Sequence, residues 1–230
     1  MKRFFVSNLI IAVLIVSAAF TSCKKDEDDE VGDMVKLLET IAWGDGYYYR
    51  FEYDSQNRIK KISNTGDVFV MLAYSGDDLA GIAKEGNTIT IGNEKYDLNN
   101  DGFLAKWSYS SDKSSQEVSF QYQDGNMTKV MSESAEYDES WEYVTEYEYD
   151  DKKSPFLNCK TPKWFMFSLE FNEYLFSYGS KNNKTEISGD DGYTTLEYEY
   201  DSEGYPTKCT SKEFYDGEEV GGNVFEFTYK

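Results

Sequence analysis

Histidine is absent from this 230-residue chain, and proline and cysteine occur only three times each. Without histidine the chain lacks the commonest general base, the Ser-His and Cys-His nucleophile pairs, and the usual ligands of catalytic zinc. Cationic side chains are also scarce, since 23 Lys and Arg stand against 43 Asp and Glu, a formal net charge of −20. A surface this acidic repels nucleic acid. We therefore expect neither a histidine-based enzyme nor a nucleic-acid-binding protein, and the sequence implies no cofactor.

Residues 1–22 predict a secretory signal peptide. Lys2 and Arg3 precede an apolar run over residues 9–16, and small residues then lead to Cys23. A charged start, an apolar centre and a small-residue end are the three regions of such a signal. An uncleaved membrane anchor is the alternative, because an apolar stretch of about 17 residues approaches the length that spans a bilayer. Polar residues inside the stretch favour the signal peptide.

The residues around Cys23 resemble the lipobox of bacterial lipoproteins, although Phe20 stands where leucine is commoner. This resemblance implies that Cys23 is lipidated and becomes the mature N-terminus. Residues 23–32 then form a charged tether that repels itself and extends. A cysteine, two lysines and the acidic run at 26–30 are also similar to the surface-export signal of Bacteroidota lipoproteins. The implied location is the outer membrane, with lipid as the only membrane contact and the domain exposed at the cell surface.

Two cysteines, Cys159 and Cys209, remain beyond the lipidation site. An oxidising compartment permits a disulfide between them. Cys209 also falls where sister segments carry Ile62, Val130 or Trp107, so a buried free thiol fits equally well. Both interpretations stay open at this point.

A strand–turn–strand unit recurs through the mature chain. Each copy has an aromatic residue two positions before a tyrosine, then a polar turn with Asp, Gly or Asn, then a short strand. Clear copies contain Tyr53, Tyr122 and Tyr200, and weaker copies centre on Tyr74, Tyr96, Tyr149, Tyr178 and Tyr229. Turn residues of these types supply left-handed backbone angles or local side-chain caps. The unit is therefore one β-hairpin with its connection.

Alternation with period two places the aromatic side chains on one face of each strand and Glu, Lys or Thr on the other. We predict a single all-β domain over residues 33–230, an antiparallel meander of roughly 12–15 strands. Open twisted sheets rarely exceed about 10 strands, so this one should be curled or closed and barrel-like. The polar outer face argues against a barrel that spans a membrane.

One or two short helices interrupt this meander. Thr161 is predicted to cap a helix with Pro162 at its first position and Gly179 at its end. Within it one helical face would carry Trp164, Phe167, Phe171, Leu175 and Tyr178. An aromatic strand over 165–171 is the alternative. A second short helix is weakly indicated over residues 33–41.

Taken together, these residues resemble a Bacteroidota lipoprotein family of unknown function with a porin-like β fold. The likeness rests on the lipobox and its acidic tail, the repeated Tyr-Asp turns, and the segments 101–104, 154–156 and 180–184. Asn183-Lys184 departs from the family, where a Leu-Pro step is expected. The Tyr-Asp units are also similar to the repeats of secreted Rhs-type shell proteins. Neither resemblance implies a catalytic residue.

A possible metal site begins at Asp97. Asp97, Asn99 and Asp101 match the first half of an EF-hand calcium loop. Its twelfth position is Ser108 instead of glutamate, so the bidentate ligand is missing. We therefore favour a hydrogen-bonded β-turn over a metal site.

Aromatic residues make up 17% of the chain. Most should form the core, but a ring exposed on a curved sheet can stack on a sugar. Trp43, beside Gly44 and Gly46, is the first candidate for an exposed ring, and Trp141 among acidic residues is the next. These two are the candidate ligand-binding residues.

Together these features predict a non-enzymatic, surface-exposed lipoprotein whose β domain is a binding or accessory module, with carbohydrate as the ligand class. A structural or protein-interaction subunit of an outer-membrane complex is the alternative. A carboxylate-based hydrolase would need two acids that converge in a pocket, one with a raised pKa.

Overall fold

The computed structural model describes residues 35–44, 46–65, 67–136, 139–172, 175–190 and 192–230. The predicted signal peptide, the lipidation site Cys23 and the tether lie outside the described residues. Fifteen strands form one antiparallel sheet, and two short strands form a hairpin of their own. The strands are β1 (Leu38–Trp43), β2 (Tyr47–Tyr53), β3 (Ile59–Asn64), β4 (Asp67–Met71), β5 (Tyr74–Ser75), β6 (Asp78–Leu79), β7 (Ala83–Glu85), β8 (Thr88–Ile91), β9 (Glu94–Leu98), β10 (Leu104–Ser110), β11 (Ser114–Gln123), β12 (Asn126–Glu136), β13 (Glu139–Tyr149), β14 (Lys184–Gly189), β15 (Gly192–Tyr200), β16 (Pro206–Tyr215) and β17 (Glu218–Tyr229).

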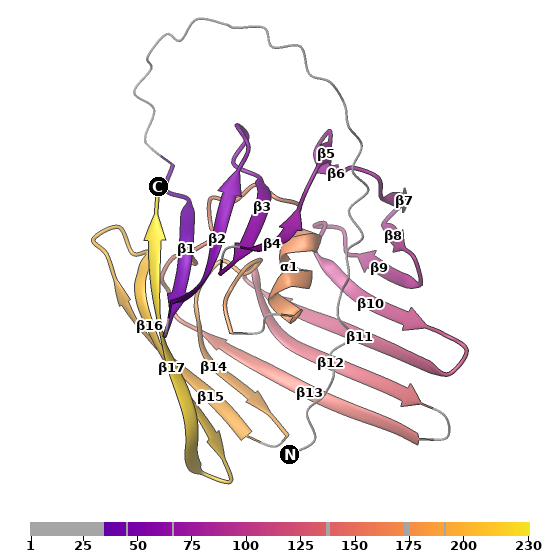
Figure 1. Cartoon of the computed structure of the whole chain (residues 1–230). Helices are drawn as coiled ribbons and strands as arrows, with labels where there is room; N and C mark the ends of the chain where they lie inside the picture. Colours follow the sequence, from indigo (N-terminus) through magenta and orange to yellow (C-terminus); the bar gives the residue numbers. More distant parts are fainter. Residues whose placement is uncertain (1–34, 45, 66, 137–138, 173–174, 191) are drawn as a thin grey trace, which may run out of the picture.

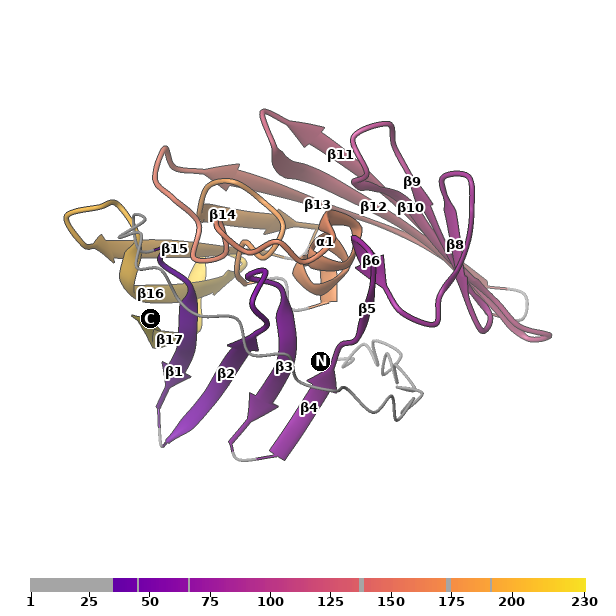
Figure 2. The same ribbon diagram turned by 90° about the horizontal axis from the view of Figure 1, so that it is seen from above.

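The prediction of an all-β antiparallel meander is confirmed. The sheet order is β4-β3-β2-β1-β17-β16-β15-β14-β13-β12-β11-β10-β9-β8-β7, so each strand pairs with its sequence neighbours except where β1 meets β17. There Ile41 lies opposite Phe227. β4 and β7 end this order, and the sheet of described strands is strongly curled but not closed (Figures 1 and 2).

The single helix of the described residues, α1 (Lys163–Asn172), lies inside the curl (Figure 2). Its side chains are buried on nearly every side, and the buried set contains Trp164, Phe165, Met166, Phe167 and Leu169. Phe167 packs on Tyr122 and Phe103 with ring centroids 4.7 and 4.9 Å apart. Sheet and helix therefore share one aromatic core, which is why the sequence of α1 also fits a strand pattern.

Three details of the helix predictions are wrong. α1 ends at Asn172 rather than at Gly179. The Thr161 hydroxyl does not cap the helix, because its oxygen accepts the N–H of Ile59 at 2.8 Å. Packing requires a glycine at position 179, because a Cβ atom there would lie 2.5 Å from the Phe167 ring. Residues 38–43 form β1, so the second short helix is also wrong there, since pairing with β2 and β17 outweighs the local helical pattern.

Four of the recurring tyrosines, which are half-buried, use their hydroxyl groups in the same way. Each donates a hydrogen bond to the carbonyl of a residue at or near the start of an earlier strand. The pairs are Tyr74 with Ile59, Tyr122 with Leu104, Tyr149 with Met127 (2.6 Å each) and Tyr229 with Pro206 (2.8 Å). Burial raises the pKa of all four phenols. Tyr178 is not a copy of this unit, because it lies in the irregular segment between α1 and β14.

Three turns share one hydrogen-bonded form. In each, a side-chain oxygen accepts the N–H groups two and four residues later at 2.9 or 3.0 Å, and the residues are Asp54, Asn99 and Asp201. The backbone N–H of the same residue donates to the carbonyl four positions later. The repeated Tyr-Asp motif therefore marks a turn that is closed by hydrogen bonds to the side chain and backbone of its first residue.

The turn at Asp150 has the same form with a long insertion. Asp150 Oδ1 accepts the N–H of Lys152 at 3.0 Å, but its second donor is the N–H of Asn183 at 3.1 Å. The Asp150 N–H likewise donates to the Asn183 carbonyl. Asn183 thus replaces the residue four positions later, and the segment 153–182, which includes α1, contains an insertion in a repeated turn.

A buried ion pair fastens this insertion to the sheet. Glu170 on α1 and Lys184 at the start of β14 are fully buried, with Oε1 and Nζ 3.5 Å apart. Glu170 Oε2 also accepts the N–H groups of Gly179 and Ser180 at 2.7 and 2.8 Å. The Lys184 amine lies 4.4 Å from the Tyr147 ring centroid, and burial lowers its pKa.

Both described cysteines are buried free thiols. Burial raises the pKa of Cys209 to about 12 and raises that of Cys159. The sequence left open whether Cys159 and Cys209 form a disulfide or remain free thiols, and in the structure they are free thiols.

Candidate ligand-binding surface

The candidate site is a patch of aromatic and polar side chains on the inner face of β10–β13. Trp107 faces α1, because its ring lies 6.4 Å from Phe171. Cross-strand neighbours of Trp107 and Tyr109 share this face, since directly opposite residues point to the same side. We call the seven half-buried or exposed residues of these two rows the concave aromatic patch: Trp107, Tyr109, Gln116, Ser132, Ser134, Trp141 and Tyr143.

The two rows repeat one arrangement. The first runs from Trp107 through Val118 and Ser132 to Tyr143, and the second contains Tyr109, Gln116, Ser134 and Trp141. Each row has an aromatic residue on β10 and another on β13. Neighbouring strands are about 4.8 Å apart, so the flanking aromatics are separated by about 14 Å. The patch is therefore a polar strip between two aromatic margins.

Contacts to the core hold the β10 margin in place. Trp107 Nε1 donates to Glu94 Oε2 at 3.2 Å, and the Tyr96 hydroxyl donates to the same carboxylate oxygen. Gln116 Nε2 donates to Ser132 Oγ at 3.2 Å in the polar strip. A surface held on regular strands presents its groups with little conformational entropy to lose on binding.

The chemistry of the patch suits a ligand with both apolar faces and hydroxyl groups. Aromatic rings offer flat apolar surfaces, and serine and glutamine side chains both donate and accept hydrogen bonds. Trp141 is the most accessible tryptophan of the patch, at 37% exposure. Figure 1 shows that β10–β13 extend past α1, so this part of the sheet is not covered by the helix.

Trp43 lies on a different wall of the curl from Trp141. Its ring packs against Tyr49, Tyr47 and Phe225 with centroids 5.3, 6.2 and 6.2 Å apart. Trp43, predicted as an exposed ring, is only partly exposed, because these neighbours on β2 and β17 half-bury it. Its neighbour Tyr47 is the exposed ring of that cluster. The structure does not bring Trp43 and Trp141 into one site.

The Asp97 segment forms a turn. Asn99 Oδ1 accepts two backbone N–H groups, and Asp97 Oδ1 accepts the Thr88 hydroxyl at 2.6 Å. Asp101 is exposed. Across the described part of the chain, no three His, Cys, Asp or Glu side chains lie close enough together to hold a metal ion.

The described residues also form two hollows, of which the second adjoins the patch. One of about 540 Å³ lies at the start of α1, where Asp78 accepts the Trp164 indole N–H at 2.9 Å and pairs with Lys84 at 3.0 Å. The other, of about 460 Å³, crosses β10–β13. Its lining includes one whole row of the patch, Tyr109, Gln116, Ser134 and Trp141, together with residues that alternate with them and face outward. There Glu117, Glu133 and Glu142 lie opposite one another on adjacent strands.

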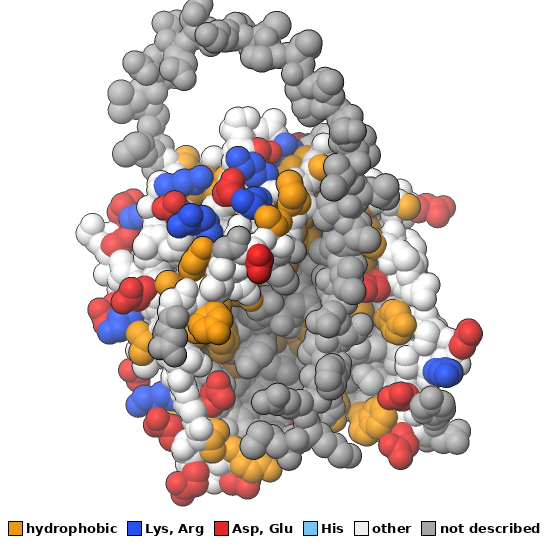
Figure 3. Space-filling view, viewed as in Figure 1, with side chains coloured by type: hydrophobic (Ala, Val, Ile, Leu, Met, Phe, Trp, Pro, Cys, Tyr) orange, Lys and Arg blue, Asp and Glu red, His pale blue; other side chains and the backbone are white. Residues whose placement is uncertain are grey.

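No helix among the described residues is both long and apolar enough to cross a membrane. Charge is unevenly distributed over the face seen in Figure 3: cationic side chains gather near the C-terminal end, and acidic side chains dominate the hairpin ends.

Comparison with known proteins gives distant likenesses. No protein-family model matches the sequence, and no curated protein matches it significantly. The structure is similar to that of a porin-like protein from Bacteroides uniformis, with 14% identity, a TM-score of 0.40, and coverage of 85% of this chain and 95% of that one. A porin-like protein from Bacteroides vulgatus gives 13% identity, a TM-score of 0.47, and coverage of 85% and 99%. Likenesses at this level carry no argument about function.

Proposed function

We propose that this protein is a non-catalytic, lipid-anchored outer-membrane protein whose concave aromatic patch binds carbohydrate at the cell surface. The observation that carries the proposal is the pair of rows with aromatic ends and polar centres across β10–β13. A pyranose has apolar C–H faces that pack on rings and hydroxyl groups that need partners, and this patch offers both. The span of about 14 Å between its margins is long enough for several sugar units.

The position of the chain ends supports an orientation in which the patch faces away from the membrane. The Leu37 N–H donates to the Lys230 carbonyl at 3.1 Å, so both ends of the described chain lie together. The end of β12 and the start of β13, close to Trp141, lie on the opposite side of the molecule (Figure 1). A lipid at Cys23 would then hold the former end near the membrane and leave the patch accessible from outside.

Four surface carboxyl groups lack the property that a carboxylate-based hydrolase requires of its acid. Hydrogen bonds from neighbouring cations and backbone N–H groups lower the pKa of Glu52, Asp54, Asp151 and Asp201. A carboxylate-based hydrolase needs an acid whose pKa is raised.

The test is a panel of host and plant polysaccharides added to the chain from residue 35 onward, followed by thermal unfolding. A glycan at about 100 times its dissociation constant stabilises the fold by about 2.7 kcal/mol. We expect one glycan class to raise the melting temperature, and Trp141→Ala and Tyr109→Ala to remove the shift. Tyr193→Ala is the matched control, because Tyr193 on β15 is 38% exposed and lies outside the patch. No shift with any glycan, or a shift unchanged by Trp141→Ala, would exclude this function.

A protein-interaction role is favoured by a different observation. On the outer face, the exposed ring of Tyr193 stacks on Phe214 with ring centroids 4.6 Å apart. Exposed apolar groups that cluster often mark protein contacts. Cross-linking at the cell surface should then recover one reproducible partner, and Tyr193→Lys should abolish its recovery.

A further inference from the structure

The charged side chains that border the concave aromatic patch on its own face are acidic. Glu94 lies on this face, because it pairs directly opposite Tyr109. Glu136 and Glu139 lie opposite each other at the end of β12 and the start of β13, and each is two positions beyond a residue of the second row. Residues two apart on a strand point to the same side of the sheet. Three carboxylates therefore border the patch, one beside its β10 margin and two beyond its second row.

The lysines of β9–β13 lie on the opposite, outer face. Each adjoins an inward-facing residue of its own strand, and each forms an ion pair with an outer-face acid. The pairs are Lys95 with Asp97 at 3.5 Å, Lys106 with Glu117 at 2.5 Å and Lys129 with Glu146 at 2.8 Å. In the turn before β11, the exposed Lys113 follows the exposed Asp112, so these two charges offset each other. The ammonium groups of the strands therefore face away from the carboxylates that border the patch.

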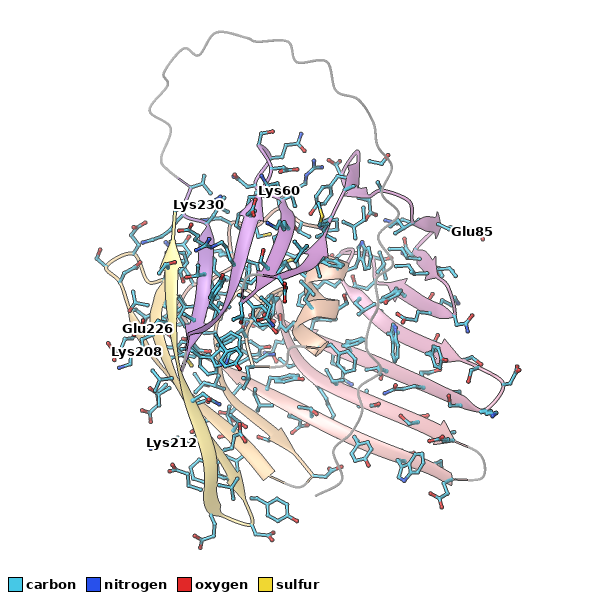
Figure 4. All side chains as sticks on the ribbon, viewed as in Figure 1. Lys60, Glu85, Lys208, Lys212, Glu226 and Lys230 are labelled. Atoms are coloured by element: carbon cyan, nitrogen blue, oxygen red, sulfur yellow. The ribbon has the colours of Figure 1, made fainter. Side chains whose placement is uncertain are left out.

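Negative charge predominates over the whole of β10–β13. Residues 104–149 contain ten Asp or Glu and three Lys. Other cationic side chains belong to other parts of the sheet: Figure 4 labels lysines on β3, on β16 and at the end of the chain, namely Lys60, Lys208, Lys212 and Lys230. Because the field at a surface is the sum over the charges around it, the patch lies in a negative field.

The nearest carboxylates act on a ligand of the patch even at physiological salt. Two residues along a strand cover about 7 Å, so Glu136 and Glu139 begin about that far from the second row. The Debye length at 0.15 M ionic strength is about 8 Å. Salt therefore screens the charges incompletely over this distance.

We propose that the patch binds uncharged glycans and rejects glycans that carry carboxylate or sulfate groups, an inference that rests on the proposed carbohydrate-binding function. An anionic group on a glycan that spans both rows meets like charge, which raises the free energy of that complex. An uncharged glycan of the same backbone contacts the same rings and hydroxyl groups without this repulsion. The rings thus supply affinity, and the glutamates supply selectivity.

The test compares neutral polysaccharides with their own charged derivatives. Dextran, soluble starch and galactomannan, and any further neutral glycan that the panel identifies, are each measured beside a carboxymethylated and a sulfated form. A hydroxyethylated form of equal substitution controls for bulk. Calorimetric titration of the chain from residue 35 onward gives the dissociation constants. At about 0.1 M salt we expect the charged forms to bind at least about tenfold more weakly than the neutral form. The ratio should narrow at about 1 M salt, where the Debye length is about 3 Å.

Two double variants locate the selectivity. Glu136→Gln combined with Glu139→Gln should narrow the ratio between the two dissociation constants. Glu197→Gln combined with Glu226→Gln is the matched control, because it removes two exposed carboxylates on β15 and β17, outside the patch, and should leave the ratio unchanged. Charged forms that bind as well as neutral ones, or a ratio that the first double variant leaves unchanged, would overturn this inference and leave carbohydrate binding intact. Binding of neither form to the wild-type chain would overturn the proposed function as well.

Discussion

At the residue scale, buried polar groups with defined partners stabilise the fold at the ends of its strands. Tyrosine hydroxyls donate to carbonyls across the sheet, and Asp or Asn side chains close the turns. The tyrosines could be predicted as inward-facing from the alternation alone. Their carbonyl partners could not, because each bond joins residues 15 to 23 positions apart and depends on the register.

The buried phenols predict loss of stability in alkali. The pKa of Tyr74 is raised to about 12 by burial, and those of Tyr122, Tyr149 and Tyr229 are also raised. In the unfolded chain a phenol ionises near about pH 10. Above that pH the folded state retains protons that the unfolded state loses, so stability is complete below about pH 10 and falls as pH rises. Ultraviolet absorbance should show a cooperative burst of tyrosinate together with loss of circular dichroism. A gradual titration near pH 10 with intact structure would contradict this.

The buried pair gives a second prediction at this scale. Glu170→Leu removes the buried carboxylate that pairs with the Lys184 amine and accepts two backbone N–H groups, so it should cost about 3–5 kcal/mol. Lys184→Met leaves Glu170 its two N–H donors and should cost less. Urea unfolding of both variants and of the double variant measures the order. Equal costs for the two single variants would show that the N–H bonds of Glu170 contribute little.

At the element scale, the regular strands were predictable and the insertion was not. Period-two alternation identifies β2, β11 and β15, and the aromatic run identifies α1. The end of the helix and the role of Asn183 were missed, because Asn183 completes a turn that begins 33 residues earlier at Asp150. The sequence signal was the departure from the expected Leu-Pro step at Asn183-Lys184. Likewise, Trp141 was identifiable as a candidate, but Gln116 and Ser134 join it only through strand register.

The contact between the insertion and α1 gives a prediction for glycine. Gly179→Ala places a methyl group against the Phe167 ring and should destabilise the fold by about 1–3 kcal/mol. Gly189→Ala is the matched control, because its nearest neighbour to a new Cβ is 3.8 Å away. Thermal unfolding of the two variants measures the difference in their stability. A Gly179→Ala protein as stable as the control would mean that Phe167 can shift freely.

At the whole-molecule scale, the adjacent chain ends predict tolerance of rearrangement. A short linker can join Lys230 to Lys36, and new ends can open at the exposed Asp216-Gly217 turn between β16 and β17. This circular permutant should fold with unfolding close to that of the parent. Opening instead between Gly179 and Ser180, whose N–H groups bond to Glu170, should prevent folding. Circular dichroism and unfolding cooperativity distinguish the two outcomes.

The pairing of β1 with β17 also bears on when the molecule can fold. Ile41 is among the first described residues to leave the ribosome or an export channel, and its partner Phe227 is among the last. The hairpins of β1–β4 and β7–β17 can each form from neighbouring sequence, but their junction needs the whole chain. Contacts between such distant residues close slowly, because the entropy of a long loop is lost before any contact forms. The pairing of β1 is therefore complete only once β17 is present. A chain truncated before β17 would leave one side of β1 without its partner strand.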